Sequence, residues 1–222
     1  MIDSILNDIE LRVLGCLIEK QITTPEYYPL TLNALTHASN QKNNRDPVVA
    51  FEEATVARGL EGLRNKKLVS TVTGTGIRVQ KYNHCFDEVF ELSRPEVTVL
   101  CLLMLRGPQT VGELRTRSGS MYNFESLADV ETVLNTLATR NTRPLVGRLP
   151  RQTGQKEVRF CHMLSGLLPD TIPEPTLPPD PTLLQLRAEH ERIDHLEGEI
   201  RSLTSRMTEL QHQFDAFKKQ FE

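Results

Sequence analysis

Apolar residues recur with helical spacing at two places in the first 168 residues, and a repeat relates the two places. The run Val13-Leu14-Gly15-Cys16-Leu17-Ile18 matches the run Val99-Leu100-Cys101-Leu102-Leu103-Met104 at an offset of 86 positions. A second apolar stripe, with spacings of four and three residues, also occurs in both copies, as Val56, Leu60 and Leu63 and as Val130, Leu134 and Leu137. Such spacings place side chains on one face of a helix. The pattern predicts two copies of one helical unit.

Polar residues and turns mark the ends of the predicted elements. Asn7 and Ser93 each precede a glutamate by three positions, which is the spacing of a helix-capping box. A shorter helix is expected in each copy, over Leu30–Ala38 and over Thr110–Arg117. Each third helix is followed by two strand-like runs around a turn, over residues 68–73 and 77–82 in the first copy and residues 145–149 and 157–163 in the second. Three helices followed by a hairpin is the order of a winged-helix domain.

The expected fold is therefore mainly α with small β-hairpins (α+β), with tandem winged-helix domains followed by a C-terminal coiled-coil helix. The first domain spans residues 1–92 and the second spans residues 93–168. Six of the 13 prolines fall in residues 169–181. Because proline lacks an amide hydrogen and fixes φ, this stretch predicts a linker. Residues 182–222 contain no proline and are expected to form one helix.

The last 41 residues carry a heptad repeat. Apolar side chains alternate at spacings of three and four residues over five heptads, which is the pattern of a coiled coil. The seam consists of Leu186, Ile193, Leu196, Ile200, Leu203, Met207, Leu210, Phe214 and Phe217. A helix of this length is about 60 Å long, so the seam favours pairing with a second copy of the chain. Folding back onto the chain's own domains is the alternative, and the orientation of the two helices is left open.

Charge is distributed unevenly along the chain. The formal net charge is −3, from 26 Lys plus Arg and 29 Asp plus Glu, which argues against a uniformly basic nucleic-acid coat. Residues 1–92 carry 10 basic and 12 acidic side chains, residues 93–168 carry 10 and 6, and residues 169–222 carry 6 and 11. The second domain is thus the one basic segment, and the acidic tail excludes a basic region of the leucine-zipper type.

In the first domain, the loop before the third helix is the candidate for contacting DNA. It contains Lys42, Asn43 and Arg45, whose amide and cationic groups are donors of the kind that contact phosphates and base edges. Arg58 and Arg64 follow on the third helix. Three glutamates on or just before that helix would repel phosphates, namely Glu52, Glu53 and Glu61. A polar loop beside a solvated helix is the alternative interpretation.

Two glycines interrupt the third helix of the first domain. Gly59 and Gly62 lie three positions apart and therefore on one face. Each costs about 1 kcal/mol relative to alanine in a helix. Close packing against a neighbouring helix is the expected reason, with close approach by a partner as the alternative.

In the second domain, arginines near the hairpin and the second helix are the candidate contacts. Arginine suits phosphate because its planar group donates two parallel hydrogen bonds. The candidates are Arg115 and Arg117 at the end of the second helix and Arg148, Arg151 and Lys156 on the wing. The third helix begins with acidic residues, which complement the helix dipole better than they fit a groove of DNA. Recognition by that helix is therefore not expected, and a solvated arginine face is the alternative.

Enzymatic and metal chemistry find no support in the sequence. The chain lacks Gly-x-Ser-x-Gly, a phosphate-binding Gly-rich loop and His-Glu-x-x-His, so we expect a protein that is not an enzyme and needs no cofactor. His84-Cys85 and Cys161-His162 end the two hairpins. Adjacent strand residues point to opposite faces, and the usual paired spacing of zinc ligands is absent. We expect no metal site.

Membrane insertion and export are also not expected. The longest apolar run without a charge is Val97–Leu105, of nine residues, whereas a spanning helix needs about 20. The start of the chain is acidic and lacks the basic region of a signal peptide. The four cysteines are too few and too scattered for a disulfide framework, which favours a reducing cytoplasm.

Several motifs resemble those of a known family. They include Leu14-Gly-Cys-Leu-Ile-Glu-Lys20, Tyr28-Pro-Leu-Thr-Leu-Asn33, Asn40-Gln-Lys-Asn-Asn-Arg-Asp-Pro47, Leu103-Met-Leu-Arg-Gly-Pro-Gln-Thr110 and Arg148-Leu-Pro-Arg151. On these residues the chain resembles the uncharacterised bacterial YceH-type proteins, which are built from tandem winged-helix domains. The resemblance covers about residues 6–168 and implies the fold and a cytoplasmic bacterial setting. It implies no activity or ligand, so no functional residue is transferred from it.

Together these patterns favour a dimeric DNA-binding protein of the transcription-regulator type. Its expected partners are double-stranded DNA and a second copy of the chain. The alternative is a protein-interaction scaffold whose winged helices bind protein partners, because both third helices carry acidic residues.

Overall fold

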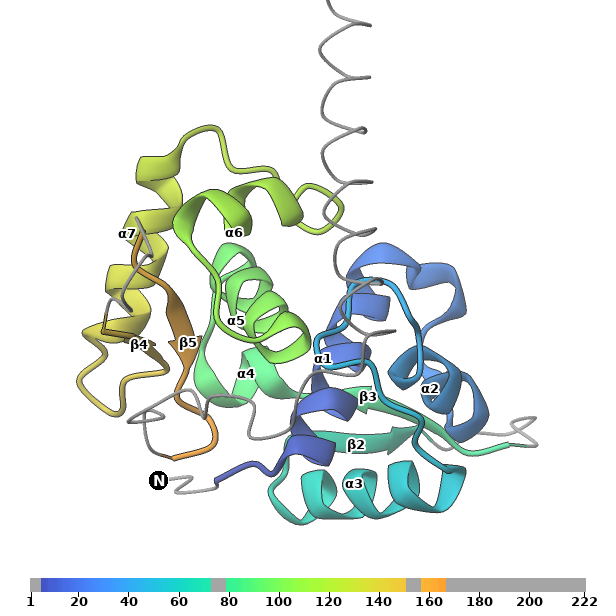
Figure 1. The fold of residues 1–222 in the computed structure, drawn as a ribbon. Helices are drawn as coiled ribbons and strands as arrows, with labels where there is room; N and C mark the ends of the chain where they lie inside the picture. The colour runs from blue at the N-terminus through green and yellow to red at the C-terminus, as the bar shows by residue number, and fades with distance from the viewer. Residues whose placement is uncertain (1–4, 73–78, 151–156, 167–222) are drawn as a thin grey trace, which may run out of the picture. The chain divides into compact units, whose positions relative to one another are not determined.

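A computed structural model of the protein describes residues 5–72, 79–150 and 157–166. The described residues form a mixed α and β protein with small antiparallel sheets (Figure 1). Its elements are α1 (Asp8–Thr23), a 3-10 turn η1 (Pro25–Tyr27), β1 (Leu30–Thr31), α2 (Leu32–Ser39), α3 (Glu53–Asn65), β2 (Val69–Val72), β3 (Lys81–His84), α4 (Phe86–Phe90), α5 (Arg94–Arg106), α6 (Val111–Arg117), α7 (Leu127–Ala138), β4 (Val146–Arg148) and β5 (Phe160–His162). The expected linker and heptad helix lie outside the described residues, as do Arg151 and Lys156.

The expected helix starts are confirmed by their capping interactions. At the start of α1, the Glu10 amide donates to Asn7 Oδ1 and the Asn7 amide donates to the Glu10 carboxylate, each at 2.9 Å. Ser93 and Glu96 form the corresponding box at the start of α5. Such boxes satisfy amides that have no partner within the helix. The two long apolar helices therefore begin where the sequence indicates.

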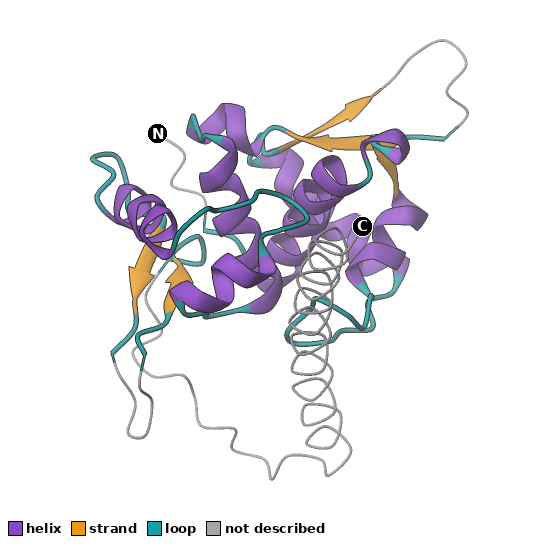
Figure 2. Ribbon diagram, turned by 90° about the horizontal axis from the view of Figure 1, so that it is seen from above, coloured by secondary structure: helices purple, strands orange, loops and turns teal. Residues whose placement is uncertain are grey.

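Each half of the described chain contains a small antiparallel sheet. In the first half the strand order is β1-β3-β2, with Leu30 opposite Tyr82 and Val69 opposite His84. In the second half β4 pairs with β5, and Gln109 bridges Phe160. Gln109 precedes α6 as β1 precedes α2, so the repeat extends to the sheets. Figure 2 shows the two sheets on separate sides of the helices.

Three local expectations need correction. The segment expected as a helix over Leu30–Ala38 begins with the short strand β1, because Thr31 caps α2 and its backbone pairs with β3. The second strand of the first hairpin lies at Lys81–His84, later than expected. Helix α4 was not expected at all, and its five residues are too few to show a period in the sequence.

The core runs through both halves. Helices α1 and α5 lie side by side at its centre (Figure 1), and their apolar runs are buried along the whole length of the repeat match. Leu14 and Leu100 are both fully buried, as are Leu63 of α3 and Leu137 of α7. The described residues up to 166 form one compact unit. The boundary expected near residue 92 lies between α4 and α5.

Candidate nucleic-acid interface

The inner face of α3 is fixed against α1. Val56, Leu60 and Leu63 are buried, and the two glycines lie at the crossing of the helices. A Cβ atom on Gly59 would lie 2.9 Å from Ile9 Cγ2, and one on Gly62 would clash with the carboxylate of Glu10. The expectation of internal packing is confirmed, so these glycines are not a surface for a partner.

The outer face of α3 presents two arginines to solvent. Arg58 and Arg64 are both exposed. The Arg58 guanidinium donates to Thr55 Oγ1 at 3.2 Å, whereas the Arg64 side chain makes no hydrogen bond or ion pair with the described residues. Glu61 lies between them on the same face and is also exposed. The face therefore offers long, unburied guanidinium groups together with one carboxylate.

A groove adjoins this face where α3 ends and β2 begins. Its volume is about 510 Å³. The residues that line it are Glu61, Arg64, Asn65, Val69, Ser70 and Thr71. The groove is polar, and Thr71 Oγ1 in it has no hydrogen-bond partner among the described residues.

Two neighbouring lysines at the end of α3 have different roles. Lys66 Nζ forms an ion pair with Glu10 at 2.5 Å and donates to the carbonyl of Ile5 at 2.8 Å. Lys67 is exposed and adopts a left-handed backbone with φ of 60°. The sequence places both lysines just after the third helix and does not distinguish them, because only the fold shows the partner of Lys66.

The loop before α3 contains both surface groups and a buried anchor. Lys42 and Asn43 are exposed, and neither side chain has a partner among the described residues. The Arg45 side chain is completely buried and binds both carboxylate oxygens of Glu19, at 2.6 and 3.0 Å. The expectation that Arg45 contacts phosphate is corrected, because its guanidinium faces the interior and is fully used there.

Most arginines of the second half brace the fold. Arg115 donates to the carbonyl of Glu125 at 2.8 Å, and Arg117 donates to Gln109 Oε1 at 3.1 Å and lies 3.7 Å from Glu113. Other arginines of this half also bind backbone carbonyls, namely Arg140 (Phe90), Arg143 (Met163) and Arg159 (Pro108). Arg148 is exposed and has no partner among the described residues. The sequence does not distinguish arginines that bind backbone carbonyls of the same half from arginines whose side chains stay exposed, because it does not show their partners.

The histidines at the hairpin ends are buried. Desolvation lowers the pKa of His84 to about 4, and the nearby Asp87 carboxylate only partly opposes this. Burial also lowers the pKa of His162 to about 4.

Within residues 5–72, 79–150 and 157–166, no three His, Cys, Asp or Glu side chains gather in a way that could hold a metal ion. In the same ranges, no helix is long and apolar enough to cross a membrane.

Fold and surface define a class of α+β protein with two copies of a three-helix unit, each completed by an antiparallel strand pair. Residues 6–155 match the family described as "Protein of unknown function, DUF480". The chain belongs to this family, whose curated members carry the name UPF0502 protein. The expectation of an uncharacterised family is confirmed.

Several relatives extend the similarity along nearly the whole chain. A UPF0502 protein of Geobacter sulfurreducens is 52% identical over 218 residues, covering 98% of this chain and 99% of the relative. A UPF0502 protein of Geotalea uraniireducens is 54% identical over 217 residues, covering 98% of each. One from Opitutus terrae is 58% identical over 177 residues, which is 80% of this chain and 77% of the relative.

Proposed function

We propose that the protein is a dimeric, non-enzymatic DNA-binding protein of the transcription-regulator type that acts in the cytoplasm. In this proposal each half is a winged helix, with α3 and α7 as the third helices and the β2–β3 and β4–β5 pairs as the wings. The order of three helices and an antiparallel pair in each half supports it. The four free cysteine thiols support a reducing compartment.

The observation that carries the DNA proposal is the outer face of α3. Arg58 and Arg64 are six positions apart, about 1.7 helical turns, and Lys67 follows just after the end of the helix. Arginine and lysine at such positions can bind phosphates on either side of a groove. Glu61, between the arginines, can accept a hydrogen bond from the cytosine amino group. We therefore place the proposed DNA contact on the first half, although the charge count favours the second half.

The second half supports a different partner. Helix α7 contains no lysine or arginine. Its first residue, Leu127, is 48% exposed, and nearby Tyr122 is 37% exposed. Exposed apolar groups of this kind fit a protein surface better than a phosphate backbone. The second candidate function is thus a scaffold role in which the second half binds a protein while α3 binds DNA or another protein.

Fluorescence anisotropy with genomic duplex fragments across a salt series tests the DNA proposal. Arg58→Ala and Arg64→Ala should each weaken binding for all sequences and flatten the salt slope by about one counterion. Arg94→Ala, which removes an exposed arginine at the start of α5, is the control and should leave the slope unchanged. Failure to bind more tightly than about 100 μM at low salt would reject the proposal, since non-specific binding is typically stronger.

A further inference from the structure

A polar pocket lies where the end of α1 meets the loop between α2 and α3. Its volume is about 440 Å³, which falls in the range of small-molecule pockets. Glu19, Lys20 and Thr23 of α1 form one side. The loop residues 41–44 form the other side, and Ser120 joins from the second half. The pocket therefore touches both halves of the repeat.

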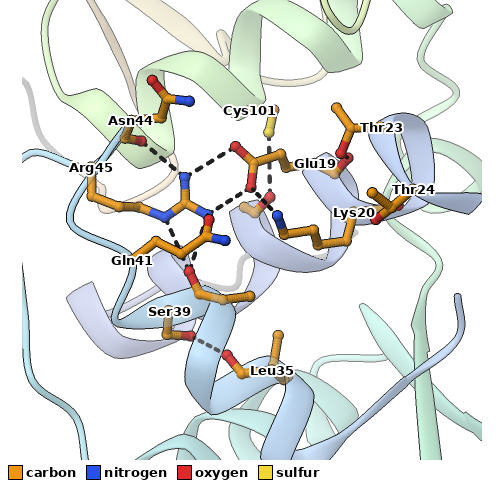
Figure 3. Close-up of polar contacts among 12 residues, drawn as sticks. Glu19, Lys20, Thr23, Thr24, Leu35, Ser39, Gln41, Asn44, Arg45 and Cys101 are labelled. Atoms are coloured by element: carbon orange, nitrogen blue, oxygen red, sulfur yellow. Dashed lines mark hydrogen bonds and ion pairs between the residues drawn. The ribbon is translucent and has the colours of Figure 1, made fainter. Parts of the chain in front are cut away.

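Arg45 holds the wall of this pocket rigid from behind. Figure 3 shows its guanidinium between Glu19 and Gln41, with further bonds to the backbone. Nε and Nη2 donate to the carbonyl of Ala38 at 3.3 and 3.1 Å, and Nη1 donates to the carbonyl of Asn44 at 2.9 Å. A loop fixed by so many charge-assisted bonds is organised before a ligand arrives.

Two arginines determine which atoms of the loop amides remain available. Gln41 Oε1 accepts from Arg45 Nη2 at 3.0 Å, and Asn44 Oδ1 accepts from Arg106. The two amide oxygens each accept a hydrogen bond from an arginine. The amino groups of Gln41 and Asn44 have no partner among the described residues. Each amino group is a donor with no capacity to accept. The pocket thus offers more donors than acceptors, since of its three lining amides only that of Asn43 keeps an oxygen with no partner among the described residues.

The charges around the pocket also favour a ligand that accepts hydrogen bonds and carries negative charge. Glu19 is neutralised by the bidentate contact with Arg45. Lys20 Nζ lies 3.7 Å from Glu19 Oε2 at the pocket side, and Lys42 has no partner among the described residues. Two lysines and one arginine at or behind the pocket lining therefore outnumber the single carboxylate of Glu19. An excess of donors and of positive charge matches the oxygen atoms of a carboxylate or phosphoryl group.

We propose that this pocket binds a small organic anion that carries carboxylate or phosphoryl groups. The anion contacts Lys42 and the amino groups of Gln41 and Asn44, and it bridges the first half to Ser120 of the second. The site is separate from the outer face of α3 and does not depend on DNA binding. Because the bound anion would contact both halves, its concentration would affect how tightly the two halves pack.

The test is a titration of the ¹⁵N-labelled full chain, without DNA, followed by nuclear magnetic resonance. Sodium phosphate and sodium citrate are the probes, added separately at ionic strength held constant with sodium chloride. We expect saturable shifts of the side-chain amino signals of Gln41 and Asn44. The stronger of the two probes shows whether the site prefers a phosphoryl or a carboxylate group. Lys42→Gln should weaken that binding about tenfold, the effect of one charge-assisted hydrogen bond.

The control is Lys81→Gln, which removes a cation from strand β3 and leaves the pocket lining intact. It should bind either probe as the unmodified chain does. Equal weakening by Lys42→Gln and Lys81→Gln would show general charge screening and overturn the proposal. Absence of saturable shifts with both probes below about 10 mM would also overturn it. A DNA-binding failure alone changes neither result, because no DNA is present.

Discussion

Gly15 and Cys101 occupy equivalent positions in the two copies of the repeat, and they touch. The Cys101 thiol donates to the carbonyl of Gly15, with Sγ 3.3 Å from the oxygen. Burial raises the pKa of the Cys101 thiol well above its ordinary value, so the thiol keeps the proton that it donates. Equivalent positions of the two copies therefore meet at the crossing of α1 and α5. The missing side chain at position 15 lets α5 approach α1 there.

Adding one methyl group at this crossing should destabilise the protein. A Cβ on residue 15 would lie 2.8 Å from Leu105 Cδ2 and 2.9 Å from its Cγ, and Leu105 is itself buried. Gly112 in α6 is the matched control, because a Cβ there meets nothing closer than 3.9 Å. Both changes to alanine gain helix propensity. We expect Gly15→Ala to be less stable than Gly112→Ala by about 1 to 3 kcal/mol in urea unfolding. Equal stabilities would contradict the close crossing.

Stability should fall as the pH is lowered, because His84 is buried in its neutral form. Its Nδ1 accepts the Phe86 amide at 3.3 Å, and its Nε2 lies 2.6 Å from Gln21 Oε1, so the proton belongs on Nε2. The unfolded chain binds a second proton near pH 6.5, whereas the folded chain does so only near pH 4. Above pH 6.5 this histidine has no effect on stability. Between pH 6.5 and pH 4 it removes up to about 1.4 kcal/mol per pH unit.

Urea unfolding at about pH 7 and about pH 5 measures this loss. His84→Gln should reduce the difference between the two conditions, because glutamine does not titrate. His37→Gln, at an exposed position of α2, is the control for removing a histidine. Part of the loss should remain in His84→Gln, since the pKa of His162 is lowered in the same direction. A pH dependence that His84→Gln leaves untouched would show that this ring does not stay neutral when folded.

The sequence predicts the helices well because their signals are local. Capping boxes at Asn7 and Ser93 and the stripes on α3 and α7 lie within a few residues of the structure they specify. Strand β1 was missed because its two residues are strand-like only through pairing with β3, which lies about 50 positions later in the chain. Long-range pairing leaves no periodic pattern in so short a segment.

The candidate sites were harder to predict, because the role of a cation depends on its partner. Arg45 lies in a loop rich in polar residues and looks like a surface group, yet Glu19, from the preceding α1, draws it into the interior. Arg115 and Arg117 similarly bind groups of their own half. Arg58 and Arg64 are exposed because their helix buries its opposite face. Only the fold shows which helix faces are buried, and therefore which arginines bind groups of the protein and which stay exposed.

The heptad seam of residues 186–217 lies outside the described residues, and dimerisation through it stays a prediction. Light scattering of the full chain should give the mass of a dimer. Ile200→Asp combined with Leu203→Asp places carboxylates at adjacent seam positions, where burial without a partner costs several kcal/mol. This double variant should be a monomer. Ser205→Asp, two residues further along and at the outermost position of the heptad, should remain a dimer. A monomeric full chain, or equal masses for the two variants, would contradict a coiled coil.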